Sequence, residues 1–71
     1  MTPQFRIIKR DSKYFVEYLE KKATIFNKAI WKPYITWSGL NSAYAFYTYN
    51  SALDELTIEV RRNAIINYLE L

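Results

Sequence analysis

The chain lacks cysteine and histidine altogether, and these two absences exclude much of the chemistry that enzymes use. Without them there is no thiol nucleophile, no imidazole base, and no imidazole or thiolate ligand for a metal ion. Disulfide bonds are excluded for the same reason. The single glycine leaves no room for a glycine-rich loop that binds phosphate. We therefore expect a protein that is not an enzyme and uses no metal or cofactor.

Long apolar runs are also missing, and we expect no leader sequence. A membrane-spanning helix needs about 20 consecutive apolar residues, and no stretch of this chain approaches that length. The first ten residues already contain Pro3, Arg6, Lys9 and Arg10, so they do not match the apolar segment of a signal peptide. The sequence predicts no membrane partner and a cytoplasmic location, in a cell or in an infected host.

Apolar and aromatic residues are abundant for so short a chain. Hydrophobic residues make up 51% of the 71 positions, with seven tyrosines, four phenylalanines and two tryptophans. A domain of this size removes only about 60% of its unfolded surface from water. We expect one domain, residues 1–71, with a thin core. Disulfide bonds and metal sites with imidazole or thiolate ligands are excluded, so they cannot stabilise such a core. Self-association remains available as a source of stability, and we predict a homodimer.

Two segments near the start of the chain predict an antiparallel hairpin. Residues 5–10 alternate as a strand does, and residues 14–19 are rich in β-branched and aromatic side chains, with a polar turn between them. A turn of two or of four residues gives the same register. The predicted pairs are Phe5 with Tyr18, Ile7 with Val16 and Lys9 with Tyr14 on one surface, and Arg6 with Glu17 and Ile8 with Phe15 on the other. Opposite charges and apolar side chains then face each other, as strand pairing favours.

The middle of the chain predicts further strands. Residues 31–37 and 43–49 are typical of strands, and residues 38–42 of a loop. Residues 21–29 fit a strand extension, a loop or a short helical turn equally well.

From Ser51 onward, the hydrophobic period changes to that of a helix. Ser51 is the predicted N-cap, with Asp54 and Glu55 in the first turn. Apolar residues then recur at helical spacing, in a stripe that would pack on the hairpin residues Phe5, Ile7, Val16 and Tyr18. This stripe comprises Leu53, Leu56, Val60, Ala64, Tyr68 and Leu71. The predicted fold is therefore α+β: an antiparallel sheet of three or four strands followed by one long C-terminal helix packed on one face.

Apolar side chains that this fold leaves uncovered predict a protein-binding surface. One helix covers only one face of a sheet, so apolar residues on the other face, and those beside the buried stripe, remain exposed. The predicted partner-binding residues are Ile8, Phe15 and Leu19 of the hairpin and Ile58, Ile65 and Leu69 of the helix. We expect a small non-enzymatic interaction module that binds a protein partner or a second copy of itself. Its size and composition suit an accessory or inhibitor protein of a phage or mobile element.

The distribution of charge supports an alternative function. Residues 1–50 carry eight basic and three acidic side chains, a net of +5, whereas residues 51–71 carry two basic and four acidic ones, a net of −2. Basic residues interleaved with aromatic ones are typical of surfaces that bind nucleic acid. The candidate contacts are Arg6, Lys9, Arg10, Lys13, Lys21 and Lys22. Nucleic acid is therefore the second class of partner that the sequence allows.

Overall fold

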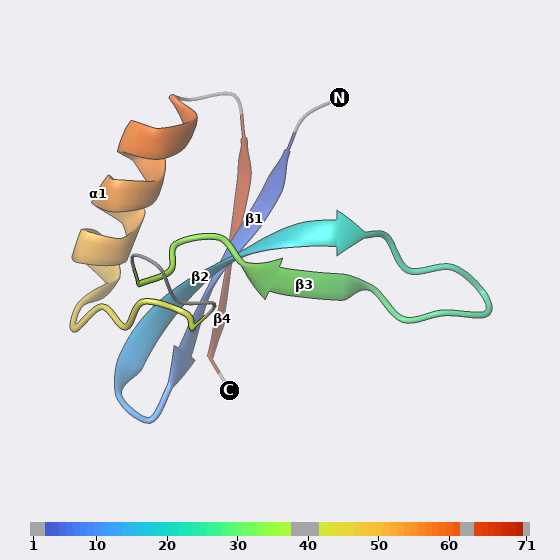
Figure 1. The fold of residues 1–71 in the computed structure, drawn as a ribbon, viewed down its shortest axis with the longest axis horizontal. Coiled ribbons are helices and arrows are strands. Elements are labelled where there is room, and N and C mark those ends of the chain that lie inside the picture. The colour runs from blue at the N-terminus through green and yellow to red at the C-terminus, as the bar shows by residue number, and fades with distance from the viewer. Residues whose placement is uncertain (1–2, 38–41, 62–63, 71) are drawn as a thin grey trace.

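The computed structural model describes residues 3–37, 42–61 and 64–70, which form a four-stranded sheet and a helix (Figure 1). The elements are β1 (Gln4–Arg10), β2 (Lys13–Lys21), β3 (Ile30–Pro33), α1 (Tyr49–Val60) and β4 (Ile65–Glu70). The strands lie in the order β3-β2-β1-β4, so β1 and β2 are central and β3 and β4 form the edges. Helix α1 packs on one face of this sheet (Figure 1). The α+β class predicted from the sequence is confirmed.

The β1–β2 hairpin has the register that the sequence predicts. All of the predicted pairs form, and Arg10 pairs with Lys13, which leaves Asp11 and Ser12 as a two-residue turn. Both turn residues have positive φ, 54° and 64°, as a type I′ turn requires. The twist of this turn type matches that of the two strands. The turn therefore fixes which side chains of the hairpin point to each face of the sheet.

Helix α1 begins earlier and ends sooner than predicted. It starts at Tyr49 because Thr48, and not Ser51, is the N-cap: the Thr48 hydroxyl accepts a hydrogen bond from the Ser51 amide at 3.1 Å. The first turn consequently holds no acidic residue. The helix ends before Arg61, which adopts a left-handed φ of 55° and donates its amide to a carbonyl of the last turn at 2.9 Å. The predicted Ser51 cap and the predicted long helix are therefore wrong.

The segment predicted to complete the helix is strand β4, and this strand makes the sheet mixed. β4 runs parallel to β1, with Ile66 beside Phe5 and Tyr68 beside Ile7, whereas β1–β2 and β2–β3 are antiparallel. Residues 65–70 carry apolar side chains at both odd and even positions. As a strand, they cover the free edge of β1 and add apolar groups to both faces of the sheet. The prediction of a purely antiparallel sheet is wrong for this reason.

The strands predicted between β2 and α1 are only partly formed. β3 covers the first part of the predicted strand at 31–37 and pairs with β2 through a register shift. The predicted strand at 43–49 is reduced to two isolated bridges, Thr36 with Ala43 and Tyr14 with Phe46. Phe46 and β3 share the outer edge of β2, so neither pairs along its whole length.

The middle of the chain also contains the connection between β2 and β3. Residues 22–29 form a loop, one of the three alternatives left open by the sequence, and Figure 1 shows it projecting away from the sheet. The loop predicted at 38–42 lies, apart from Ser42, outside the described residues, as does Leu71 of the predicted helical stripe.

The core lies between α1 and the hairpin, where the sequence predicts it. The fully buried residues of this cluster are Phe5, Ile7 and Val16 of the sheet and Ala52 and Leu56 of the helix. Of the other residues in the predicted stripe, those that pack partly buried against this cluster are Leu53, Val60 and Ala64. Tyr68, by contrast, is 47% exposed because it lies on the edge strand β4.

Candidate functional site

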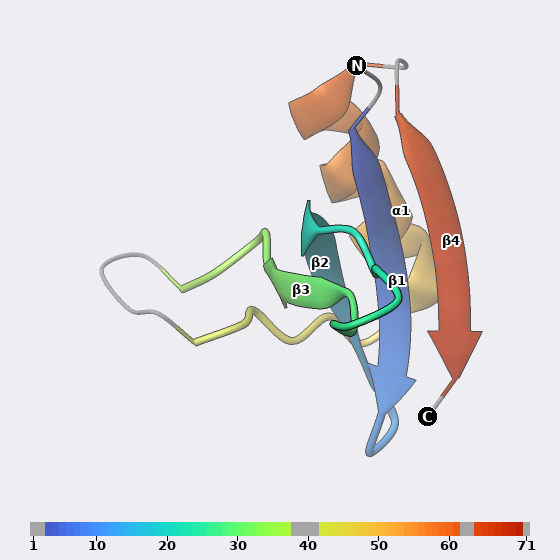
Figure 2. The same cartoon turned by 90° about the vertical axis from the view of Figure 1, so that its right-hand side faces the viewer.

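The two faces of the sheet have different surroundings. Ile7 and Val16 point toward α1 and belong to the core, while the next residues along the strands, Ile8 and Phe15, point the other way. Figure 2 shows β1 and β4 side by side with α1 behind them. We call the second face the open face, because α1 packs on the opposite side. It comprises Gln4, Arg6, Ile8 and Arg10 of β1, Lys13, Phe15, Glu17 and Leu19 of β2, Trp31 and Pro33 of β3, and Ile65, Asn67 and Leu69 of β4.

The apolar side chains of the open face differ in how much they expose. Ile8 lies at the centre between Phe15 and Leu69 and is only 1% exposed. Ile65 and Leu69 on the edge strand are 46% and 42% exposed. The half-buried ones are Phe15, Leu19 and Trp31. Ile8 therefore supplies the floor of an apolar surface, and the surrounding residues supply the area that another molecule can contact.

Two arginines of the open face lie against aromatic rings. The Arg6 guanidinium is 4.5 Å from the centre of the Trp31 ring, and its Nη2 lies 2.6 Å from Oε1 of Glu17. The Arg10 guanidinium is 4.9 Å from the centre of the Phe15 ring. A guanidinium stacked in this way covers the ring while its edge still donates hydrogen bonds. Because Glu17 neutralises Arg6, the net positive charge of this face lies with Arg10, toward the hairpin turn.

The structure brings together most of the predicted partner-binding residues. Ile8, Phe15 and Leu19 lie on the open face as predicted. Ile65 and Leu69 join them there, on a strand instead of the predicted helix. Ile58 is the exception: it lies on α1, on the other side of the sheet, and is 69% exposed.

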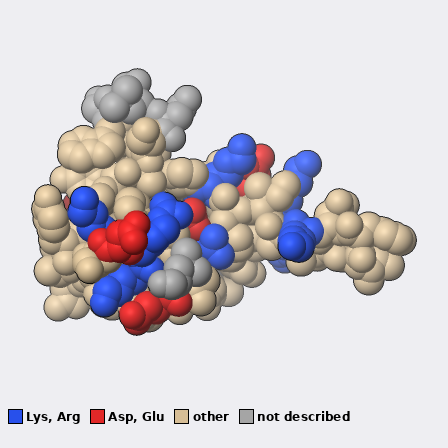
Figure 3. All heavy atoms as spheres, turned by 90° about the horizontal axis from the view of Figure 1, so that it is seen from below, with Lys and Arg blue, Asp and Glu red and all other residues tan. Residues whose placement is uncertain are grey.

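The predicted nucleic-acid contacts are divided over the molecule. Arg6, Arg10 and Lys13 are on the open face, whereas Lys9 is on the face of α1, where its Nζ lies 3.8 Å from Oε1 of Glu70. The remaining two, Lys21 and Lys22, lie at the far end of β2. Seen from below, basic and acidic side chains are mixed in the broad part of the molecule (Figure 3). The structure does not gather these six side chains on one surface.

Sequence reasoning did not place Trp31 among the partner-binding residues, and it missed the tip of the β2–β3 loop. Trp31 was assigned to a strand, but its place on the open face depends on the pairing of β3 with β2. In the loop, Ile25 and Phe26 are 92% and 87% exposed, and a narrow projection with basic side chains near its base is visible in Figure 3. The signal for this tip is an adjacent apolar pair in a segment otherwise rich in lysine and polar residues.

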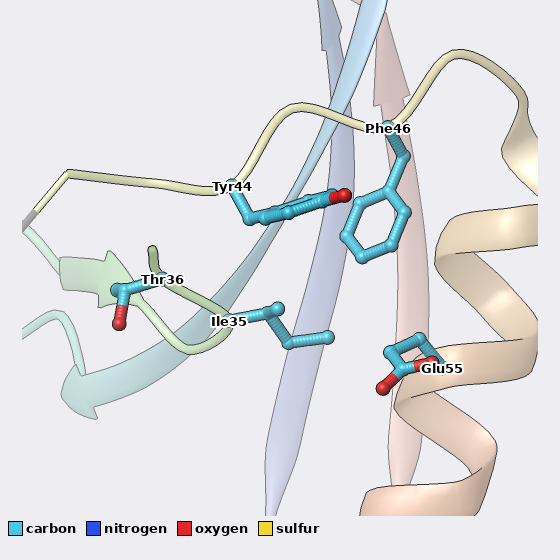
Figure 4. Close-up of a pocket in the computed structure, with 5 residues that line it drawn as sticks. All are labelled: Ile35, Thr36, Tyr44, Phe46 and Glu55. Atoms are coloured by element: carbon cyan, nitrogen blue, oxygen red, sulfur yellow. The ribbon is translucent and has the colours of Figure 1, made fainter. Parts of the chain in front are cut away.

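A shallow pocket of about 330 Å³ lies between α1 and the segment that precedes it. Figure 4 shows the rings of Tyr44 and Phe46 next to each other, with Ile35 and Thr36 below them and Glu55 of α1 at the side. Among the described residues that line the pocket, Glu55 is the one carboxylate, and Glu59, one turn further along α1, lines a neighbouring hollow that shares Ile35 and Thr36. Among the residues that the structure describes, no three Asp or Glu side chains gather in a way that would hold a metal ion.

Tyr68, on the face of α1, has a perturbed phenol. Desolvation by neighbouring atoms, followed by the negative charge of Glu70, raises the pKa of Tyr68 above its ordinary value of 10.0. The two side chains are 3.5 Å apart, between the Tyr68 hydroxyl and Oε2 of Glu70. Tyr68 is therefore protonated at neutral pH and serves as a hydrogen-bond donor.

Comparisons of the chain with models of protein families, with curated proteins and with solved structures find no significant match. Within the described residues, no helix is long and apolar enough to cross a membrane.

Proposed function

We propose that this protein is a small non-enzymatic interaction module of the cytoplasm, and that it binds another protein through the open face of its sheet. The observation that carries the proposal is the gathering of apolar side chains from three strands on the face opposite α1. These side chains are Phe15, Leu19, Trp31, Ile65 and Leu69. An apolar centre with charged residues around it is the usual composition of a protein interface.

The charges around this apolar centre define the chemistry of the partner. Glu17 neutralises Arg6, whereas Arg10 and Lys13 make no ion pair with a described residue. Their positive charge lies next to the hairpin turn, at one end of the open face. A matching protein surface has an apolar centre and carboxylates at the corresponding end, because complementary charges set the orientation of an interface.

Nucleic acid fits this surface less well. A polyanion binds where several basic side chains reach phosphates from one side of a protein. Here Arg6 is 2.6 Å from Glu17 on the open face, and Lys9 is near Glu70 on the opposite one. One face of the Trp31 ring and one face of the Phe15 ring lie against an arginine, which leaves less of each ring for stacking on a base.

The test compares two aspartate substitutions in an affinity capture from a native lysate treated with nuclease. Leu19→Asp places a charge on the open face, and Ile58→Asp places the same charge on the exposed side of α1. We expect a protein to be retained by the parent and by Ile58→Asp and to be lost with Leu19→Asp. A photoreactive benzoyl-phenylalanine in place of Phe15 then identifies whether that protein contacts the open face directly.

A salt titration of the purified pair separates the two classes of partner. Binding through an apolar interface changes little with ionic strength, whereas binding through phosphates weakens steeply. Capture that disappears with nuclease, or that is equal for all three forms of the protein, would rule out the open face as a protein-binding site.

A further inference from the structure

Within the described residues, no strand lies on the outer side of β4. β4 is at one end of the strand order, and Figure 2 shows no further strand of the described chain beyond it. The amide of Ile65 donates to the carbonyl of Pro3 at 3.0 Å, so the odd-numbered residues of β4 turn their main-chain groups toward β1. Because these groups alternate along a strand, the main-chain N–H and C=O of Ile66 and Tyr68 point outward from the sheet.

The two edges of the sheet differ in how they are protected against pairing. Natural proteins block edge strands with lysine, proline, bulges or covering segments. β3 contains Lys32 and Pro33 and pairs with β2 through a register shift. β4 has no lysine, no proline and no irregularity in its ladder with β1. Its single charge, on Glu70, is already close to Lys9.

We propose that β4 pairs antiparallel with β4 of a second copy of this chain across a two-fold axis, so that the homodimer has one continuous sheet. A two-fold axis perpendicular to the sheet makes the two edge strands antiparallel and leaves both helices on the same side. Isologous contacts of this kind are the commonest way in which proteins form dimers.

The side chains of β4 select one register for this pairing. An axis through Asn67 places Ile65 opposite Leu69 of the other copy on the open face, and Ile66 opposite Tyr68 on the face of α1. Apolar side chains then meet apolar ones on both faces. The pairs of Ile66 with Tyr68 are also the ones whose outward main-chain groups can exchange hydrogen bonds.

Neighbouring registers are less favourable. An axis through Tyr68 would set Ile66 against Glu70, and an axis through Ile66 would set Ile65 against Asn67. Both replace an apolar contact by a contact between an apolar and a polar side chain. In the Asn67-centred dimer, the open faces of the two copies lie side by side and form one wider apolar surface. The dimer forms through the edge of β4 and needs no other protein, although Ile65 and Leu69 also belong to the proposed binding surface.

Charge substitutions at the paired positions test both the dimer and its register. With Ile65→Lys and Leu69→Lys, like charges oppose each other across the axis, whereas with Ile65→Glu and Leu69→Lys, opposite charges do. We expect the parent to sediment at twice the 8.5 kDa of one chain. The lysine pair should raise the dimer dissociation constant by at least about tenfold, and the glutamate–lysine pair should restore the dimer.

A second variant tests the main-chain contacts without changing any side chain. Chemical synthesis of the chain with an N-methyl group on Tyr68 removes an outward N–H that the dimer needs, and we expect a monomer with the circular dichroism of the parent. N-methylation of Ala23, in the exposed β2–β3 loop, is the matched control and should leave the dimer intact.

Three results would overturn the proposal. They are a parent that is monomeric at high micromolar concentration, a dimer that survives N-methylation of Tyr68, and equal dimerisation of the two charge variants. None of these results touches the binding of another protein, which the Leu19→Asp variant reports separately.

Discussion

The two faces of the sheet are built from alternate residues of the same strands, yet they are completed in different ways. On one face, Ile7 and Val16 are fully buried because Leu56 and its helix lie on top of them. On the other, Ile8 is equally inaccessible but is flanked by side chains of the neighbouring strands, such as Phe15. The comparison shows that burial of a residue in β1 does not reveal which face has a covering layer.

This difference predicts that one face of the sheet determines the stability of the protein and the other face determines its binding. Side chains between α1 and the sheet hold the fold together, and their loss leaves a cavity. Apart from Ile8, the apolar side chains on the open face keep part of their surface in water, so their substitution should affect an interface more than the fold. Substitutions on the two sides should therefore differ in effect, and the largest loss of stability is expected in the core.

Leu56→Ala should destabilise the protein by about 2–5 kcal/mol, because Leu56 is fully buried in the centre of the core. Ile58→Ala on the same helix is the control: at 69% exposure, it should change the free energy of unfolding by less than about 0.5 kcal/mol. Urea denaturation followed by circular dichroism measures both. If Leu56→Ala unfolds at the same urea concentration as the parent, the core between α1 and the hairpin is incorrectly described.

Glu17→Gln should cost about 1–2 kcal/mol, because it removes the charged partner of Arg6 at a site where both side chains are largely covered. Glu20→Gln removes the more exposed partner of Lys32 and should cost less than about 0.5 kcal/mol. Unfolding at low and at high salt distinguishes the two, since salt screens the exposed pair more strongly. Equal losses for the two variants would mean that partial burial does not strengthen the ion pair between Arg6 and Glu17.

Ser12→Gly should stabilise the protein by about 0.5–1 kcal/mol, because Ser12 has a φ of 64°, a conformation that is free of strain only for glycine. Ser12→Ala retains the Cβ and should give no such gain. Thermal unfolding of the three proteins measures the difference. The turn positions both faces of the hairpin equally, so the gain in stability should leave partner binding unchanged. A change in the affinity for the partner would mean that the turn itself lies in the interface.

The hairpin was predictable because its information is local. The polar turn and the cross-strand pairs lie within residues 5–18, and only one register satisfies them. The core residue Leu56 followed from helical spacing alone. The secondary structure of residues 65–70, by contrast, depends on a distant part of the chain. Ile65 and Leu69 are four apart, which suits a helix, and the segment also carries apolar residues at both odd and even positions, which suits a strand that packs on both faces. The free edge of β1 decides between the two.

The candidate site was predicted in part, and partly for the wrong reason. Phe15 and Leu19 follow from the register of the hairpin. Ile65 and Leu69 were assigned to a helical stripe and reach the open face only because they lie on β4. Trp31 could not be placed, because its face depends on which residue of β2 it pairs with, and that residue is Leu19. Sequence therefore identifies which apolar residues remain uncovered more readily than it places them in space.

The parallel pairing of β1 with β4 also determines when the domain can finish folding during translation. The hairpin leaves the ribosome first and can form at once, because its contacts are local. The outer edge of β1 gains its strand partner only after residues 65–70 have been synthesised and released. Ile7 and Ile8 lie on the two faces of β1 along this edge. A nascent chain stalled before Ile65 would carry this unpaired apolar edge in the crowded cell, where such edges recruit other chains and begin aggregates.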